Sequence, residues 1–159
     1  KIVADGGAGN DVIDLELMTD ANIIADIEGG EGDDEIIGGY GNDVMFGGRN
    51  DDTYIVRESG DMVIEYAGEG RDTVFSNLGD YTLTANVEDL VLEYGVINGT
   101  GNALNNVIDA SAATANPTLT VIPRARIVLA WRLGFVIVSP PARPACAACG
   151  STGRGRARG

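Results

Sequence analysis

Histidine is absent from this chain of 159 residues, and both of its cysteines lie close to the C-terminal end. Without an imidazole the chain lacks the commonest general base and zinc ligand, and it contains neither an HExxH nor a GxSxG motif. Cys146 and Cys149 have the spacing of a zinc or redox pair, yet zinc needs four ligands and no second pair exists. We therefore expect no enzyme activity and no disulfide framework.

Positive charge is scarce in the first two thirds of the chain. All 24 acidic residues lie at or before Asp109, together with only 4 of the 11 basic residues, so residues 1–109 carry a formal net charge of −20. This charge excludes nucleic acid as a partner. The apolar run at residues 127–138 contains an arginine and is too short for a spanning helix, so we expect no membrane span.

Glycine and aspartate, in contrast, follow a strict period of nine residues. Residues 29–55 read GGEGDDEII, GGYGNDVMF and GGRNDDTYI without a gap, and the sixth position is always aspartate, namely Asp34, Asp43 and Asp52. An earlier copy begins at Gly6 and places Asp11 at the same position. The paired glycines supply turn conformations that are closed to residues with a Cβ. Such a fixed period predicts a solenoid.

Two nine-residue units make one coil. Asp34 and Asp52, which are two units apart, should then lie on the same edge, about 4.8 Å from each other, with Asp43 on the opposite edge. The first copy precedes Gly29 by one coil plus five residues, so a bulge within residues 15–25 would stack Asp11 on Asp34. The eighth position of each unit should point inward and form the core, which predicts a buried column of Ile27, Ile36, Met45, Tyr54 and Val63.

The stacked carboxylates require a counter-charge. Two of them about 5 Å apart repel by roughly 0.8 kcal/mol in water and by several-fold more at lower dielectric. Carboxylate and carbonyl oxygens, with no imidazole or thiolate at hand, suit a hard cation and favour Ca²⁺ over zinc. In the alternative interpretation the aspartates are only polar turn residues.

These four units resemble the RTX (repeats-in-toxin), or haemolysin-type calcium-binding, repeats of secreted bacterial proteins. The resemblance implies an all-β fold, a right-handed parallel β-roll (β-solenoid) with calcium-binding turns. It also implies that each ion lies between one turn and the turn two units later, held by aspartates and glycine carbonyls. Asn50 replaces a glycine of the family's motif, and the loop before Asp61, the expected partner of Asp43, lacks the double glycine. The implied metal ligands are Gly7, Gly9, Asp11, Gly30, Gly32, Asp34, Gly39, Gly41, Asp43, Gly48, Asn50 and Asp52.

Three segments follow from the composition. Residues 1–56 hold the calcium-binding repeats, and residues 57–115 keep short β-rich runs between Gly, Asn and Asp turns, which predicts a degenerate continuation of the roll. There Asn98, Asn102 and Asn105 either bridge coils through their amides or lie in surface turns. Residues 116–159 contain seven arginines, all five prolines and no acidic residue; we interpret them as a poorly ordered basic tail from a shifted or misassembled reading frame.

The predicted function is calcium binding by a non-catalytic folding module of a secreted bacterial RTX protein. So much negative charge on so small a core predicts a chain that folds only when a ligand binds the native state. Extracellular calcium modules work at about 0.1–1 mM, which suits export in an unfolded state, by resemblance through a type I-like system. Because repeats follow Lys1 almost at once, we expect a fragment whose attached catalytic or adhesive domain is missing. The alternatives are the C-terminal part of an exported hydrolase, either a protease or a lipase, and a surface adhesin repeat.

Overall fold

The computed structural model describes residues 1–94, 98–112, 118–120, 126–128 and 136–138. These residues form fifteen β-strands and no helix. Most strands have three or four residues, as expected where glycine-rich turns recur every nine positions. The strands are β1 (Ile2–Ala8), β2 (Val12–Asp14), β3 (Ala25–Glu31), β4 (Glu35–Ile37), β5 (Val44–Arg49), β6 (Thr53–Val56), β7 (Met62–Ile64), β8 (Thr73–Ser76), β9 (Asp80–Thr82), β10 (Asp89–Leu92), β11 (Asn98–Thr100), β12 (Val107–Asp109), β13 (Thr118–Thr120), β14 (Arg126–Val128) and β15 (Val136–Val138).

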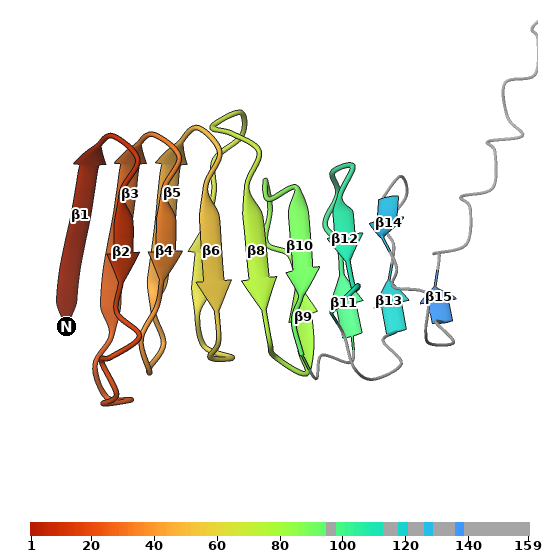
Figure 1. Cartoon of the computed structure of the whole chain (residues 1–159), viewed down its shortest axis with the longest axis horizontal. Helices are drawn as coiled ribbons and strands as arrows, with labels where there is room; N and C mark the ends of the chain where they lie inside the picture. The colour runs from red at the N-terminus through yellow and green to blue at the C-terminus, as the bar shows by residue number, and fades with distance from the viewer. Residues whose placement is uncertain (95–97, 113–117, 121–125, 129–135, 139–159) are drawn as a thin grey trace, which may run out of the picture.

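Strands pair in parallel with the strands two places away in the chain, except that β7 and β9 belong to different sheets. One face consists of the sheet β1-β3-β5-β7 and, further along, the sheet β9-β11-β13-β15, whereas the other face is the single sheet β2-β4-β6-β8-β10-β12-β14. In Figure 1 strands of the two faces run in opposite directions, and the coils stack side by side along the long axis. The predicted all-β, parallel β-solenoid is confirmed.

Strand register confirms both the coil of two units and the bulge. Asp26 pairs with Val44, and Glu35 pairs with Thr53, in each case two nine-residue units further along the chain. In the first coil, by contrast, Val12 pairs with Glu35, which lies five residues beyond that regular spacing. The five extra residues lie in the loop between β2 and β3, which leaves Asp11 in register with Asp34.

The core is a column of inward side chains between the two faces. Ile27, Ile36, Met45 and Tyr54 are 0% exposed and Val63 is 1% exposed, so the predicted column is confirmed. Alternate strand residues point inward because successive side chains of a strand lie on opposite faces. The column continues through Val74, Leu90 and Ile108.

Beyond the repeats one coil is longer and the next is shorter than two nine-residue units. Thr53 pairs with Thr73, two residues beyond the regular spacing, and Thr73 pairs with Asp89, two residues short of it, so the two deviations cancel. Pairing also extends past residue 115 through β13, β14 and β15, into the segment for which the sequence predicted a poorly ordered tail. These three strands are rich in threonine, valine and isoleucine, which favour strands. The rest of that segment, with Cys146 and Cys149, lies outside the described residues.

Candidate metal centre

The turns that join β1 to β2, β3 to β4 and β5 to β6 lie along one edge of the solenoid, the upper edge in Figure 1. Asp11, Asp34 and Asp52 immediately precede β2, β4 and β6, and register therefore stacks them. The N–H of Asp11 donates to Oδ1 of Asp34 at 2.8 Å, and the N–H of Asp34 donates to Oδ1 of Asp52 at 2.8 Å. One oxygen of each acceptor thus links two coils.

The second carboxylate oxygen of each aspartate is left over. Oδ2 of Asp11, Asp34 and Asp52 is buried and has no hydrogen-bond partner. A buried acceptor without a partner costs about 1–3 kcal/mol, and more when it is charged. A row of three such oxygens along one edge therefore indicates that a positively charged group belongs beside them.

Glycine keeps the space beside these oxygens open. A Cβ built on Gly29 would lie 2.4 Å from Oδ2 of Asp34, and one on Gly47 would lie 2.2 Å from Oδ2 of Asp52. Both distances are far shorter than a van der Waals contact. In these two units the first glycine is thus required by the carboxylate five residues later.

Carbonyl oxygens of the turns point from one coil toward the next. The carbonyl oxygens of Gly7 and Gly9 would lie 1.9 Å and 2.1 Å from a Cβ on Gly30 and Gly32, and the Gly30 carbonyl would lie 2.3 Å from a Cβ on Gly48. Gly30, Gly32 and Gly48 have φ of 119°, 130° and 106°, a left-handed backbone that glycine adopts without strain.

Asn50 adopts the left-handed backbone conformation of the motif glycine that it replaces. Its φ is 82°, the left-handed conformation that asparagine tolerates better than most residues. The Asn50 carbonyl also points toward the next coil, 1.9 Å from a Cβ built on Gly70. Carboxylate and carbonyl oxygens are therefore the donor set of this edge, and they fit Ca²⁺, which takes six to eight oxygens at about 2.3–2.6 Å.

The opposite edge differs in its hydrogen bonds. Asp43 stacks on Asp61 as expected, because the N–H of Asp43 donates to Oδ1 of Asp61 at 3.1 Å. Both oxygens of Asp43 are occupied, however: Oδ1 accepts the N–H of Ala25 at 2.8 Å and Oδ2 accepts the N–H of Gly39 at 3.0 Å. Gly41 has a φ of 130°, as in the other turns. The ligand set Gly39, Gly41 and Asp43 stays a prediction without a free carboxylate oxygen to support it.

The column on the first edge continues with residues that the sequence analysis did not place among the ligands. The N–H of Asp52 donates to Oδ1 of Asp72 at 2.9 Å, and the N–H of Asp72 donates to Oε2 of Glu88 at 2.9 Å. Glu65 also turns inward and is 5% exposed. Asp52, Glu65 and Asp72, here called the fourth-turn cluster, each offer an oxygen within 4.8 Å of the others.

A signal for Glu65 exists in the sequence, because it lies two nine-residue units after Gly47 and so occupies the first glycine position of the next coil. Its carboxylate accepts a hydrogen bond from the Tyr54 hydroxyl, which in turn accepts the N–H of Gly47. Burial is the main cause that raises the pKa of Asp52 to about 7, of Glu65 to about 8 and of Asp72 to about 6. Neighbouring carboxylates raise each pKa further. Burial likewise raises the pKa of Tyr54, which keeps this hydroxyl protonated as a donor.

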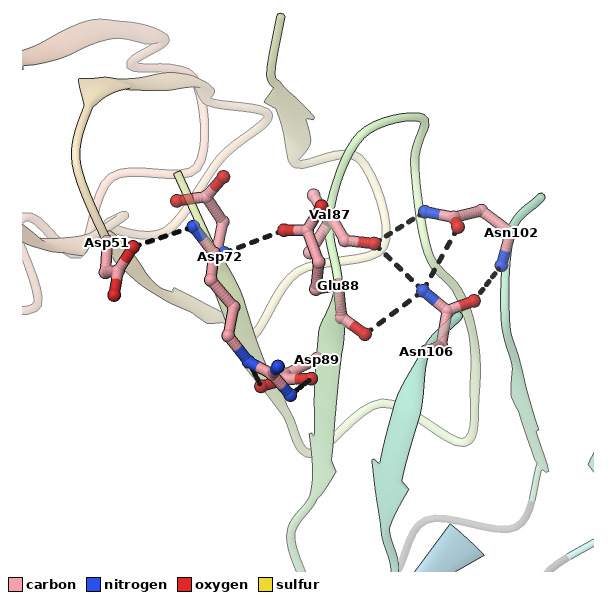
Figure 2. A network of polar contacts seen from close by, with 8 residues as sticks. Asp51, Asp72, Val87, Glu88, Asp89, Asn102 and Asn106 are labelled. Carbon is pink, nitrogen blue, oxygen red and sulfur yellow. Dashed lines mark hydrogen bonds and ion pairs between the residues drawn. The ribbon is translucent and has the colours of Figure 1, made fainter. Parts of the chain in front are cut away.

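Further along, amide side chains replace carboxylates in the column (Figure 2). Asn106 lies two units after Glu88 and donates to the carbonyls of Val87 at 3.0 Å and Glu88 at 3.1 Å. Asn102 donates to the same Val87 carbonyl at 2.7 Å. An amide brings its own N–H donors to these carbonyls, so these contacts between coils do not require a cation.

Of the two interpretations left open for the asparagines, bridging between coils holds for Asn98 and Asn102. Asn102 also reaches the carbonyl of Thr84, and Asn98 donates to Asp80. For the third bridge the structure uses Asn106 in place of Asn105, because only the residue before β12 faces inward, at 1% exposure.

Comparison with known proteins agrees with this geometry. The family described as RTX calcium-binding nonapeptide repeat matches in four copies, at residues 3–17, 26–54 and 66–83. No curated protein and no solved structure matches the chain. Among the described residues no helix is long and apolar enough to cross a membrane. Calcium binding by an RTX-type β-solenoid, a structural module, follows from the repeats. Through residues 3–83 the chain belongs to the family of RTX calcium-binding nonapeptide repeat proteins.

Proposed function

We propose that this chain is a calcium-dependent folding module of an exported RTX protein, in which ions bound along the Asp11–Asp34–Asp52 edge order the solenoid. The observation that carries the proposal is the row of three buried Oδ2 atoms without a hydrogen-bond partner. Calcium supplies the positive charge that these oxygens lack, and it links one coil to the next.

The ligands follow from the position of each oxygen. Between the first and second turns lie the carboxylates of Asp11 and Asp34 and the carbonyls of Gly7 and Gly9. Between the second and third turns lie Asp34, Asp52 and the carbonyl of Gly30. Repeat equivalence adds Gly32, Gly48 and Asn50 to the set. The proposal leaves out Gly39, Gly41 and Asp43, because both Asp43 oxygens already accept N–H groups.

Electrostatics supports a fold that depends on metal. Residues 1–109 carry a formal net charge of −20, and each of their four cationic side chains pairs with a carboxylate in an ion pair such as Lys1 with Asp26 or Arg71 with Asp89. Exposed ion pairs contribute only about 0–1 kcal/mol each. The repulsion within the buried column therefore stays uncompensated until cations bind.

The cellular role follows from calcium concentration. A module of this kind stays unfolded where calcium is scarce and folds where it reaches about 0.1–1 mM, as outside the cell. RTX repeats are typical of secreted bacterial proteins, which agrees with this role. The exported hydrolase and the surface adhesin remain predictions about an attached domain, and the module would serve either one by folding after export.

Far-UV circular dichroism of the full chain tests the proposal. Calcium is titrated from a chelated solution to about 10 mM, with magnesium as the control ion because it demands a tighter octahedral shell. We expect a cooperative gain of β signal with calcium and little change with magnesium. Equal β signal in chelator and in calcium would refute calcium-dependent folding.

A further inference from the structure

We propose that the fourth-turn cluster of Asp52, Glu65 and Asp72 is a second type of calcium site, in which a glutamate side chain takes the place of the turn glycine. The proposal rests on the proposed function, since Asp52 also belongs to the calcium edge. It adds a ligand that no nonapeptide unit of the chain supplies.

The geometry of the three carboxylates fits one ion. Their ligand oxygens all lie within 4.8 Å of one another, and bonds of about 2.3–2.6 Å allow a single Ca²⁺ to contact all three. The side chains are deeply buried, at 1% exposure for Asp52 and Asp72 and 5% for Glu65. Oδ2 of Asp52 and Oε2 of Glu65 have no hydrogen-bond partner. Two buried carboxylate oxygens without a partner, in a cluster of three carboxylates, favour a bound cation.

The register explains how a glutamate fits where the other coils require glycine. Phe46 pairs with Ile64, which places Glu65 opposite Gly47. On the other face, Thr53 pairs with Thr73, so the turn that contains Glu65 is two residues longer than the turn before it. The longer turn provides room for a side chain that would clash in a turn of the regular length.

Tyr54 holds the glutamate in place. Its buried hydroxyl donates to Oε1 of Glu65, which leaves Oε2 free for the ion. Without an ion, three carboxyl groups so close together must share protons or repel one another. With an ion they provide one more negative charge than the two aspartates of a repeat site, which increases the attraction for a divalent or trivalent cation.

The test compares the number and affinity of calcium ions bound by the full chain and by Glu65→Gln, using equilibrium dialysis with metal analysis. Glutamine keeps the acceptor for Tyr54 but lacks the charge. We expect the variant to bind one ion fewer, or to bind that ion at least about 10–100-fold more weakly, the loss seen when even an outer-shell partner is removed. The same number of ions with unchanged affinities would overturn the site.

Two further variants separate this site from the calcium edge and from a folding defect. Asp34→Asn should weaken the earlier ions and leave the fourth-turn ion in place. If Asp34→Asn loses calcium while Glu65→Gln keeps every ion, the fourth-turn site fails and the proposed function stands. If Glu65→Gln does not fold, terbium serves as the calcium probe in the wild-type chain and in Tyr54→Phe. Tyrosine-sensitised terbium emission that disappears in Tyr54→Phe, with the ion count kept, supports the site; emission that is unchanged overturns it.

Discussion

Replacing Asp34 with asparagine should change the stability of the solenoid in opposite directions with and without calcium. Asp34 lies in the middle of the column, so its charge faces Asp11 on one side and Asp52 on the other. Asparagine keeps an oxygen that can accept the N–H of Asp11 and removes only the charge. The substitution therefore isolates electrostatics from hydrogen bonding.

The magnitudes follow from the coil spacing. At about 4.8 Å each neighbouring carboxylate repels Asp34 by about 0.9 kcal/mol in water and by about 3.5 kcal/mol at an effective dielectric of 20. Without calcium, Asp34→Asn should thus stabilise the folded chain by about 2 kcal/mol or more. With calcium, two inter-coil ions lose a charged ligand, and a weakening of about 10-fold each costs about 3 kcal/mol together. The stabilisation gained from calcium should therefore fall by about 3 kcal/mol, and in calcium the variant should be about 1 kcal/mol less stable than the wild-type chain, the difference between these two effects.

Urea unfolding followed by circular dichroism, in chelator and at about 10 mM calcium, measures both effects. Asp51→Asn is the matched control, because Asp51 is the exposed neighbour of Asp52 and an amide oxygen can still accept the N–H of Arg71. The control should leave the calcium dependence nearly unchanged. If Asp34→Asn and Asp51→Asn shifted the calcium midpoint equally, a general charge effect would replace the site as the explanation.

The remaining predictions concern pH, glycine, the amide coil and the tail. Burial raises the pKa values of the fourth-turn cluster to about 6–8, so without calcium its protonated form stabilises the fold below about pH 4, and this stability is lost as the pH rises to about 8. With calcium the fold should instead become more stable as the pH rises, because the ion binds deprotonated carboxylates. A calcium titration of the β signal at pH 5 and pH 8 checks both signs. Gly47→Ala should abolish calcium-induced folding because its Cβ would lie 2.2 Å from Oδ2 of Asp52, whereas Gly79→Ala, with nothing within 4 Å of its Cβ, should fold like the wild-type chain in the same titration. Asn106→Ala removes one donor each from the carbonyls of Val87 and Glu88 and leaves the N–H of Asn102 without its acceptor, so it should cost about 1–3 kcal/mol in urea unfolding at saturating calcium, with no change in the number of ions bound. Cys146→Ser should leave the calcium midpoint unchanged, and a shifted midpoint would show that the C-terminal segment takes part in folding.

Much of the architecture could be predicted because a solenoid is nearly one-dimensional. Each coil contacts only its neighbours, so a residue's environment repeats with the sequence period. The nine-residue spacing was enough to place Ile36 and Tyr54 in the core and to stack Asp34 on Asp52. The same counting located the five-residue bulge before β3.

Predictions made by counting nine-residue steps fail where coils change length. The coil after β6 is two residues longer than two units and the next coil is two residues shorter, so counting in steps of nine loses the register there. This is why a step of 18 residues from Asp52 misses Asp72, whereas Glu88 and Asn106 fall on that spacing again because the two deviations cancel. Only the backbone pairing of β8 with β6 and β10 restores the alignment.

The repeat, the parallel solenoid, the buried column and the calcium chemistry follow from the sequence alone, because they depend on residue type at a fixed spacing. Tertiary structure decided which oxygens are free. Both edges carry an aspartate at the sixth position of the motif, yet Oδ2 of Asp34 has no partner whereas Oδ2 of Asp43 accepts the N–H of Gly39. It also brought Glu65 against Asp52 and Asp72 across a turn of altered length. Hydrogen-bond partners depend on how each turn folds against the next coil, and residue spacing does not specify that conformation.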